Sequence, residues 1–145
     1  MAIVPTNVNY NSLLLRQNLT TLNRTYPFLN IQVADTSVLG KNIYVVKLGK
    51  GPKHVFYSGS IHANEWITSV LLMKFIENYC IAYNNNSTLY SYSIRSLFNS
   101  TSIYIMPMVN PDGVGFKIID NFINYLNRIH YIKEYILYHF QIQNF

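Results

Sequence analysis

Two segments of the chain place hydrophobic side chains at the three- and four-residue spacing of a helix that is buried along one face. In residues 10–26 the leucines recur at this spacing, and Pro27 ends the pattern. Residues 65–82 form a longer pattern in which the apolar positions cover a broad face. Residues 90–98 repeat the pattern more weakly. We therefore expect two principal helices and one short helix.

Four other segments are short, rich in β-forming residues and bounded by turn residues. They are residues 29–34, 43–48, 55–59 and 101–109. The first two are joined by a short turn, which predicts an antiparallel hairpin. The last two flank the long helix, and a helical crossover is the connection that parallel neighbours require. The predicted fold class is α/β, with a mixed, partly parallel sheet flanked by helices.

The C-terminal tail differs in composition from the rest of the chain. Most of residues 116–145 are Ile, Tyr, Asn, Phe or Lys, whose codons consist largely of A and T, and Gly, Pro, Ala, Val, Ser and Thr are absent there. We therefore separate a main part, residues 1–114, from a divergent tail, residues 115–145, which we expect to be frame-shifted or truncated. The spacing of Ile119, Phe122, Ile123 and Leu126 also fits a genuine amphipathic helix.

Length and charge limit the classes of function. A chain of 145 residues, of which 50% are hydrophobic, forms one domain with a real core. The net charge is +5, but the 11 Lys and Arg are scattered along the chain. The densest stretch, between Lys41 and Lys53, is interpreted as a solvated hairpin edge. We therefore expect no nucleic-acid partner.

Targeting and redox features are few. The first residues have neither the basic region nor the apolar core of a signal peptide, so a cytoplasmic location is the default expectation. No apolar run approaches the length of about 18 residues that a membrane span needs. The single cysteine, Cys80, excludes an internal disulfide and is expected to be buried and inert.

The segment from Tyr57 to Trp66 contains the candidate chemistry. His62 follows the end of a predicted strand, and Glu65 opens the long helix, so both should lie at the carboxyl edge of the sheet. An imidazole nitrogen and a carboxylate oxygen three residues apart are both zinc donors, although a catalytic zinc takes three protein ligands. The alternative is structural: an acidic residue favoured at a helix N-terminus beside a hydrogen-bonded histidine.

Three blocks together resemble the metallocarboxypeptidases of the M14 family. They are the segment around His62 and Glu65, the strand that runs into Asn110-Pro111-Asp112-Gly113, and the segment 39–44. Their order and spacing match the family over residues 8–114. The resemblance implies that residues 1–114 are the N-terminal portion of a zinc-carboxypeptidase-like catalytic domain, with about four of its eight strands. It also implies one zinc ion with His62 and Glu65 among its ligands.

Asn64 narrows the resemblance to one branch. Digestive members usually carry Arg immediately before the metal-binding Glu, whereas this chain has Asn64 in His-Ala-Asn-Glu-Trp. The segment is more similar to the bacterial γ-D-glutamyl-diamino acid peptidases. This resemblance implies a peptide substrate, and specifically the stem peptides of peptidoglycan.

The remaining machinery of the family has no counterpart in this sequence. The resemblance implies a third His ligand, a carbonyl-polarising Arg and a general-base Glu, all beyond residue 114. His130, Glu134 and His139 stand in unrelated contexts and are interpreted as surface residues. We therefore name no catalytic residue and expect an incomplete, inactive fragment of a zinc metallopeptidase. The alternative is a non-catalytic peptide- or metal-binding domain that retains the cleft.

Two structural expectations complete the prediction. Asn110-Pro111-Asp112-Gly113 suits a type I turn that shapes the rim of the cleft without taking part in chemistry. An unfinished parallel sheet leaves an open edge and an uncovered apolar face. We therefore expect poor solubility or dependence on partner contacts.

Overall fold

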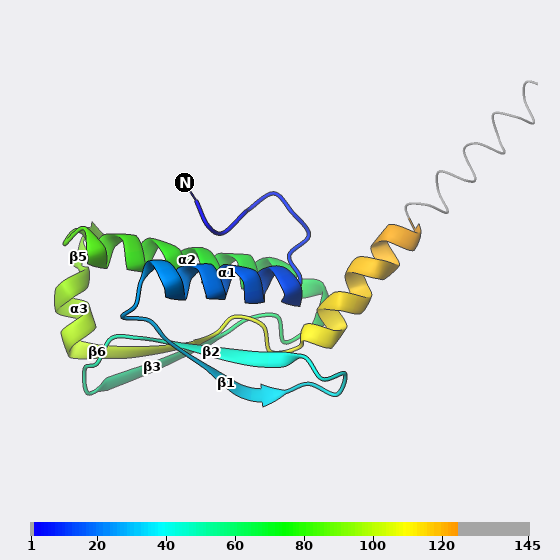
Figure 1. Ribbon diagram of the computed structural model, residues 1–145, viewed down its shortest axis with the longest axis horizontal. Helices are drawn as coiled ribbons and strands as arrows, with labels where there is room; N and C mark the ends of the chain where they lie inside the picture. The colour runs from blue at the N-terminus through cyan, green and yellow to red at the C-terminus, as the bar shows by residue number, and fades with distance from the viewer. Residues whose placement is uncertain (1, 125–145) are drawn as a thin grey trace, which may run out of the picture.

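The computed structural model describes residues 2–124, in which helices cover one face of a twisted sheet (Figure 1). The sheet has four strands, in the spatial order β1-β2-β6-β3. These are β1 (Asn30–Thr36), β2 (Asn42–Leu48), β3 (Lys53–Ser58) and β6 (Thr101–Met106). The helices are α1 (Ser12–Thr25), the short 3-10 helix η1 (Ala63–Glu65), α2 (Trp66–Asn84), α3 (Ile94–Ser100) and a last helix over residues 111–124.

The strand pairing confirms the predicted α/β fold with a mixed sheet. β1 pairs with β2, and β2 with β6, in antiparallel fashion. β3 and β6 are parallel neighbours, joined through α2, and stay in register from Lys53↔Thr101 to Ser58↔Met106. These two strands consequently end at the same edge of the sheet, where the segments that follow them lie side by side.

The core lies between the sheet and the two long helices. The side chain of Asn11 caps α1 by accepting a 3.0 Å hydrogen bond from the Leu14 amide. α1 and α2 lie over the same face of the sheet (Figure 1) and bury their apolar side chains against it. The buried residues include Leu15, Leu19, Leu22, Val46, Leu48, Val70, Met73, Ile76, Ile103 and Ile105.

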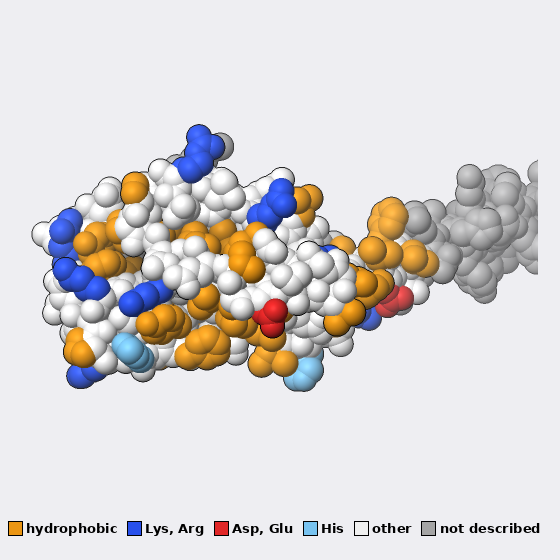
Figure 2. All heavy atoms as spheres, turned by 60° about the horizontal axis from the view of Figure 1, so that its bottom comes forward, with side chains coloured by type: hydrophobic (Ala, Val, Ile, Leu, Met, Phe, Trp, Pro, Cys, Tyr) orange, Lys and Arg blue, Asp and Glu red, His pale blue; other side chains and the backbone are white. Residues whose placement is uncertain are grey.

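The two edge strands of the sheet, β1 and β3, are largely exposed. β3 is the edge beyond β6, and all six of its residues are exposed even though its centre is the apolar run Val55-Phe56-Tyr57. The face of the sheet opposite the helices is covered by none of the described elements, and Figure 2 shows hydrophobic side chains gathered on that side. A strand with apolar side chains on both faces has the composition of a buried central strand.

Two local elements differ from the sequence-based expectation. The short helix α3 begins at Ile94, because a small hairpin of β4 (Thr88–Leu89) and β5 (Tyr92–Ser93) precedes it. Tyr90 and Ser91, at its tip, have φ values of 49° and 68°, which a right-handed helix excludes. The predicted turn at Asn110–Gly113 is the first turn of a helix: the Asn110 side chain accepts a 2.8 Å hydrogen bond from the Gly113 amide.

The tail is described only in part. Residues 115–124 continue the helix that begins at residue 111, and residues 125–145, which include His130, Glu134 and His139, lie outside the described residues. A frame-shifted or truncated origin of the tail stays a prediction. Within residues 2–124, no helix combines the length and the apolar character that crossing a membrane requires.

Candidate metal centre

His62 and Glu65 lie in the connection between β3 and α2, at the carboxyl edge of the parallel strands. β3 ends at Ser58, His62 is the residue before η1, and Glu65 is the last residue of η1. This is the position that the sequence predicts for both side chains. In open α/β sheets such an edge is where ligands bind, because the connecting segments diverge there and leave space.

The two side chains contact each other directly. His62 Nδ1 lies 2.8 Å from Glu65 Oε1, and the His62 backbone amide donates to Glu65 Oε2 at 3.4 Å. The side chains are 77% and 46% exposed, so solvent reaches both. The hydrogen bonds from the side chain and the backbone of His62 lower the pKa of Glu65. Glu65 is therefore an ionised carboxylate at neutral pH, as a metal ligand must be.

A buried hydroxyl network fixes the backbone that leads to this pair. Ser60 adopts a left-handed conformation, with φ of 49°, and is almost fully buried. Its amide donates to Thr68 Oγ1 at 2.7 Å, and its hydroxyl lies 2.6 Å from that of Ser69. Ser69 donates in turn to the Pro107 carbonyl at 2.7 Å. α2 and the segment after β6 thus hold the loop in place.

Sequence reasoning missed this network, because Ser60 lies in the loop after β3 while Thr68 and Ser69 lie on α2. Two buried serines at positions 60 and 69, joined by the half-buried Thr68, form no recognisable local pattern in the sequence. The left-handed φ falls on Ser60, although the neighbouring Gly59 is the residue that turn chemistry would favour.

The segments after β3 and β6 are joined by backbone hydrogen bonds. The Val109 amide donates to the Gly59 carbonyl and the Asn110 amide to the Ser60 carbonyl, both at 3.0 Å. A Cβ on Gly59 would lie 2.9 Å from the Pro107 carbonyl oxygen, so only glycine allows this approach. The strand end therefore has little freedom to move.

The donor set fits a zinc ion but does not complete its coordination. An imidazole nitrogen and an ionised carboxylate, adjacent and solvent-accessible, are ordinary zinc ligands. Among residues 2–124 no group of three His, Cys, Asp or Glu side chains lies close enough together to hold a metal. The described residues thus offer two of the three protein ligands that a catalytic zinc requires.

Asp112 has a structural role near this edge. Its carboxylate accepts 3.0 Å hydrogen bonds from the Ser37 hydroxyl and the Leu39 amide, and lies 3.5 Å from the Lys41 ammonium. Desolvation alone would raise the pKa of Asp112, but these hydrogen bonds and the lysine outweigh it and lower the pKa. Asp112 therefore ties the β1–β2 turn to the helix over residues 111–124.

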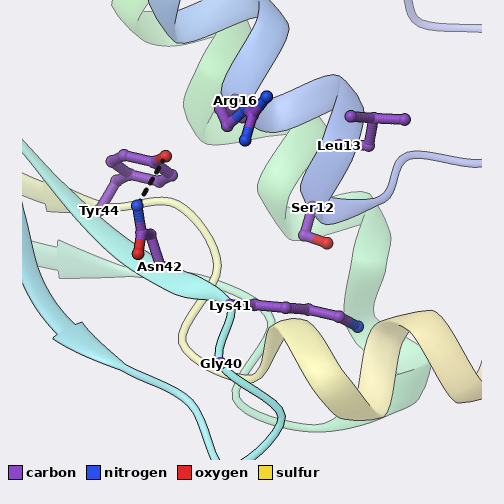
Figure 3. A pocket seen from close by; sticks show the side chains of 7 residues that line it. All are labelled: Ser12, Leu13, Arg16, Gly40, Lys41, Asn42 and Tyr44. Carbon is purple, nitrogen blue, oxygen red and sulfur yellow. Dashed lines mark hydrogen bonds between the residues drawn. The ribbon is translucent and has the colours of Figure 1, made fainter.

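A separate hollow of about 310 Å³ lies between α1 and the start of β2 (Figure 3). Arg16 and Lys41 line it, and neither candidate ligand does. The Lys41 ammonium is held by the Pro111 carbonyl at 3.1 Å, and Figure 3 shows its side chain extending toward the last helix. Because no His, Asp, Glu or Cys lines this hollow, it adds no donor to the metal centre.

Known proteins resemble this chain in both sequence and fold. It is 38% identical over 110 residues to gamma-D-glutamyl-L-diamino acid endopeptidase 1 of Lysinibacillus sphaericus, a match that covers 76% of this chain and 28% of the relative. It is 43% identical over 91 residues to the uncharacterized protein YqgT of Bacillus subtilis, covering 61% and 24%. The crystal structure of thrombin-activatable fibrinolysis inhibitor superposes with a TM-score of 0.64 at 19% identity, covering 78% and 29%, which shows a shared fold.

The chain thus spans about a quarter of the length of these relatives. The sequence profile of the family Peptidase_M14, described as zinc carboxypeptidase, matches residues 15–133. This match continues past residue 114, where the motif resemblance ends, and the division of the chain at 114/115 stays a prediction. Since the matched region includes most of the chain, with both candidate ligands, the chain belongs to the M14 family of zinc carboxypeptidases.

Proposed function

We propose that this chain supplies two zinc ligands, His62 and Glu65, to a metallopeptidase site that hydrolyses peptide amides. The observation that carries the proposal is the exposed pair itself, with His62 Nδ1 2.8 Å from Glu65 Oε1 at the carboxyl edge of β3. Membership of the M14 family supports zinc as the metal. We assign the complete peptidase activity to a larger catalytic domain than these 145 residues, since the chain spans 28% of the endopeptidase that it resembles.

Each described residue has a definite part in this proposal. His62 and Glu65 would hold the ion, and the hydroxyl network of Ser60 and Ser69 keeps their backbone in place. Zinc, when bound, lowers the pKa of a coordinated water and polarises a carbonyl oxygen. None of the residues 2–124 is assigned as general base, so the chain alone is expected to be inactive or nearly so.

The substrate class proposed is a peptide with a γ-D-glutamyl-diamino acid linkage, as in peptidoglycan stem peptides. Two observations support it: the relative from Lysinibacillus sphaericus has this linkage in its name, and Asn64 precedes Glu65 where digestive members usually have Arg. Asn64 is exposed beside the candidate ligands, so its neutral side chain would face a substrate that approaches them.

Isothermal titration with zinc tests the metal-binding part of the proposal. The 145-residue chain should bind one zinc ion weakly at neutral pH, because two donors leave the coordination incomplete. His62→Ala and Glu65→Gln should each abolish the binding. His54→Ala is the matched control, since His54 is an exposed histidine at the opposite end of β3 and should leave binding unchanged. Zinc uptake that survives the double variant H62A/E65Q would refute the assignment.

An activity assay tests the expectation that the chain is incomplete. The purified chain with zinc should release no diamino acid from a γ-D-glutamyl-diamino acid peptide. Turnover by the chain alone would show that the assignment of missing groups is wrong. Zinc-independent binding of that peptide by the H62A/E65Q variant would instead favour a non-catalytic peptide-binding domain.

A further inference from the structure

The hollow between α1 and the start of β2 has a lining that suits a negatively charged ligand. Its volume is about 310 Å³, at the lower end of the roughly 300–1,000 Å³ of small-molecule pockets. α1 contributes Ser12, Leu13 and Arg16 to the lining, and the segment at the start of β2 contributes Lys41 and Tyr44. None of the Asp and Glu side chains within residues 2–124 lines it. Both charged side chains of the lining are therefore cations.

Arg16 is the cation of this hollow that is available to a ligand. Figure 3 shows it on α1, facing Tyr44 on β2 across the hollow. It is exposed, and none of the ion pairs within residues 2–124 includes it. A guanidinium group presents five N–H donors in one plane, which match the paired oxygens of a phosphate or a carboxylate. Arg16 can therefore supply both charge and hydrogen bonds to an oxyanion.

Lys41 shapes the hollow but adds little net charge to it. Its ammonium donates to the Pro111 carbonyl at 3.1 Å and lies 3.5 Å from the Asp112 carboxylate, which does not line the hollow. Asp112 therefore offsets the charge of Lys41 and holds the side chain in place. The first turn of α1 has no acidic residue to offset Arg16 in the same way. The net positive charge that a ligand meets is consequently that of Arg16.

The uncharged side chains of the hollow add donors and one apolar surface. The Tyr44 hydroxyl accepts a 3.2 Å hydrogen bond from Asn42 Nδ2, drawn as the dashed line in Figure 3. A phenol oxygen that accepts in this way keeps its own hydrogen for donation. Ser12 on α1 contributes a second hydroxyl, and Leu13, which is 57% exposed, contributes the apolar surface. This lining fits a ligand that combines an oxyanion with a short organic part.

We propose that this hollow binds a small organic oxyanion, a phosphate monoester or a carboxylate, through the Arg16 guanidinium and the Tyr44 hydroxyl. Both groups donate, and an oxyanion accepts from both, which makes these charge-assisted hydrogen bonds stronger than neutral ones. Neither His62 nor Glu65 lines the hollow, so this is a second site, distinct from the metal centre. The inference uses neither zinc nor peptide hydrolysis and is independent of the proposed function.

Isothermal titration of the 145-residue chain with phenyl phosphate tests the inference. The titration is done at low salt, with a chelator present so that no metal contributes. We expect one site with a dissociation constant of about 1 mM. Arg16→Gln should weaken binding at least about tenfold. Arg24→Gln is the matched control, because Arg24 is an exposed arginine in the last turn of the same helix and lies outside the hollow. It should change the affinity less than about twofold, as general charge screening predicts.

Two conservative variants separate a specific contact from net charge. Arg16→Lys keeps the charge but loses the planar pair of donors, and it should weaken binding about threefold to fivefold. Tyr44→Phe keeps the ring but loses the hydroxyl, and it should also weaken binding about threefold to fivefold. Circular dichroism of each variant without ligand should match the parent chain. Full affinity in both Arg16→Lys and Tyr44→Phe would overturn the placement of the oxyanion.

A comparison of ligands identifies the kind of oxyanion. Tighter binding of phenyl phosphate than of phenylacetate would assign the site to phosphate esters, and the reverse order would assign it to carboxylates.

Three results would overturn the inference: no binding of either compound at about 10 mM, equal losses in Arg16→Gln and Arg24→Gln, or inorganic phosphate that binds as tightly as phenyl phosphate. The double variant H62A/E65Q should bind phenyl phosphate like the parent chain, and a loss there would place the anion at the metal centre instead. Failure of the proposed function is distinguishable, because zinc uptake that survives H62A/E65Q leaves all these affinities unchanged.

Discussion

At the scale of single residues, the backbone that carries the candidate metal ligands is held by buried hydroxyl groups. His62 and Glu65 are exposed and bond mainly to each other. Ser60 and Ser69, in contrast, are buried and link α2 to the segment after β6. An exposed pair can be oriented only if the backbone beneath it is rigid, and this network provides that rigidity.

Ser69→Ala should therefore destabilise the chain. The change removes the donor to the Pro107 carbonyl and the partner of the Ser60 hydroxyl, so two buried groups lose a hydrogen bond. The expected loss in the free energy of unfolding is about 1–3 kcal/mol, measured by urea denaturation followed by circular dichroism. Ser96→Ala, on an exposed face of α3, is the control and should change it by less than about 0.5 kcal/mol. Equal effects at both positions would contradict the network's role.

Asp112 gives a pH-dependent prediction. The pKa of Asp112 in the folded chain is below its ordinary value. The stabilisation that Asp112 gives the folded state is therefore fully present at pH above the ordinary pKa, and it is lost as pH falls through the folded pKa. Asp112→Asn should therefore lower the thermal midpoint at pH 7, and the difference from the parent chain should shrink as pH falls below about 4. Asp120→Asn is the control, because Asp120 contacts one exposed lysine, Lys117, at 3.2 Å. A difference that grows in acid would refute the proposed contacts.

At the scale of elements, α2 has apolar side chains on two sides, one packed on the sheet and one exposed near β3. One side packs on the sheet and buries Met73 completely, whereas the side near β3 leaves Leu71 largely exposed. This explains why the predicted apolar face of the helix is so broad: it includes positions for the core and positions that line an open hollow between α2 and β3.

The two sides should respond differently to the same kind of truncation. Met73→Ala leaves a cavity in the core and should cost about 2–5 kcal/mol in unfolding free energy. Leu71→Ala, two residues earlier on the same helix, should cost less than about 0.5 kcal/mol in the isolated chain. Chemical denaturation of both variants measures this contrast. A large loss for L71A would mean that this hollow is already covered in the isolated chain.

At the scale of the whole molecule, the described elements cover one face of the sheet and leave both of its edges, β1 and β3, unpaired. The uncovered apolar side chains of β3 are of the kind that other copies or unrelated proteins can contact without specificity. The buried core therefore sets the stability of this chain, whereas the exposed apolar side chains of β3 set its solubility.

The isolated chain is expected to bind the dye anilinonaphthalene sulfonate and to associate without a fixed stoichiometry. Phe56→Lys should reduce dye fluorescence and raise the soluble concentration, because a charge opposes association through this face. Val38→Lys adds the same charge outside it and should do neither. A monodisperse parent chain with a cooperative melt and no dye binding would contradict this expectation.

The sequence by itself determined the two long helices, the four strands of the main sheet and their connections, but not the β4–β5 hairpin or the helix that begins at residue 111. Helical spacing located α1 and α2, the short turn after β1 predicted the antiparallel hairpin, and the helix between β3 and β6 predicted their parallel pairing. His62 and Glu65 could also be found, since both stand in one short segment at a strand end. These features are local, and periodicity and turn chemistry act within a few residues.

Only the tertiary structure decided which groups meet across the chain. That β3 is an edge strand, that Ser69 donates to the Pro107 carbonyl, and that Asp112 ties down the β1–β2 turn all depend on residues far apart in sequence. The apolar run of β3 predicts a strand, but not whether anything covers it. The reason is physical: burial and long-range hydrogen bonds arise from the packing of whole elements, and no local pattern encodes their partners.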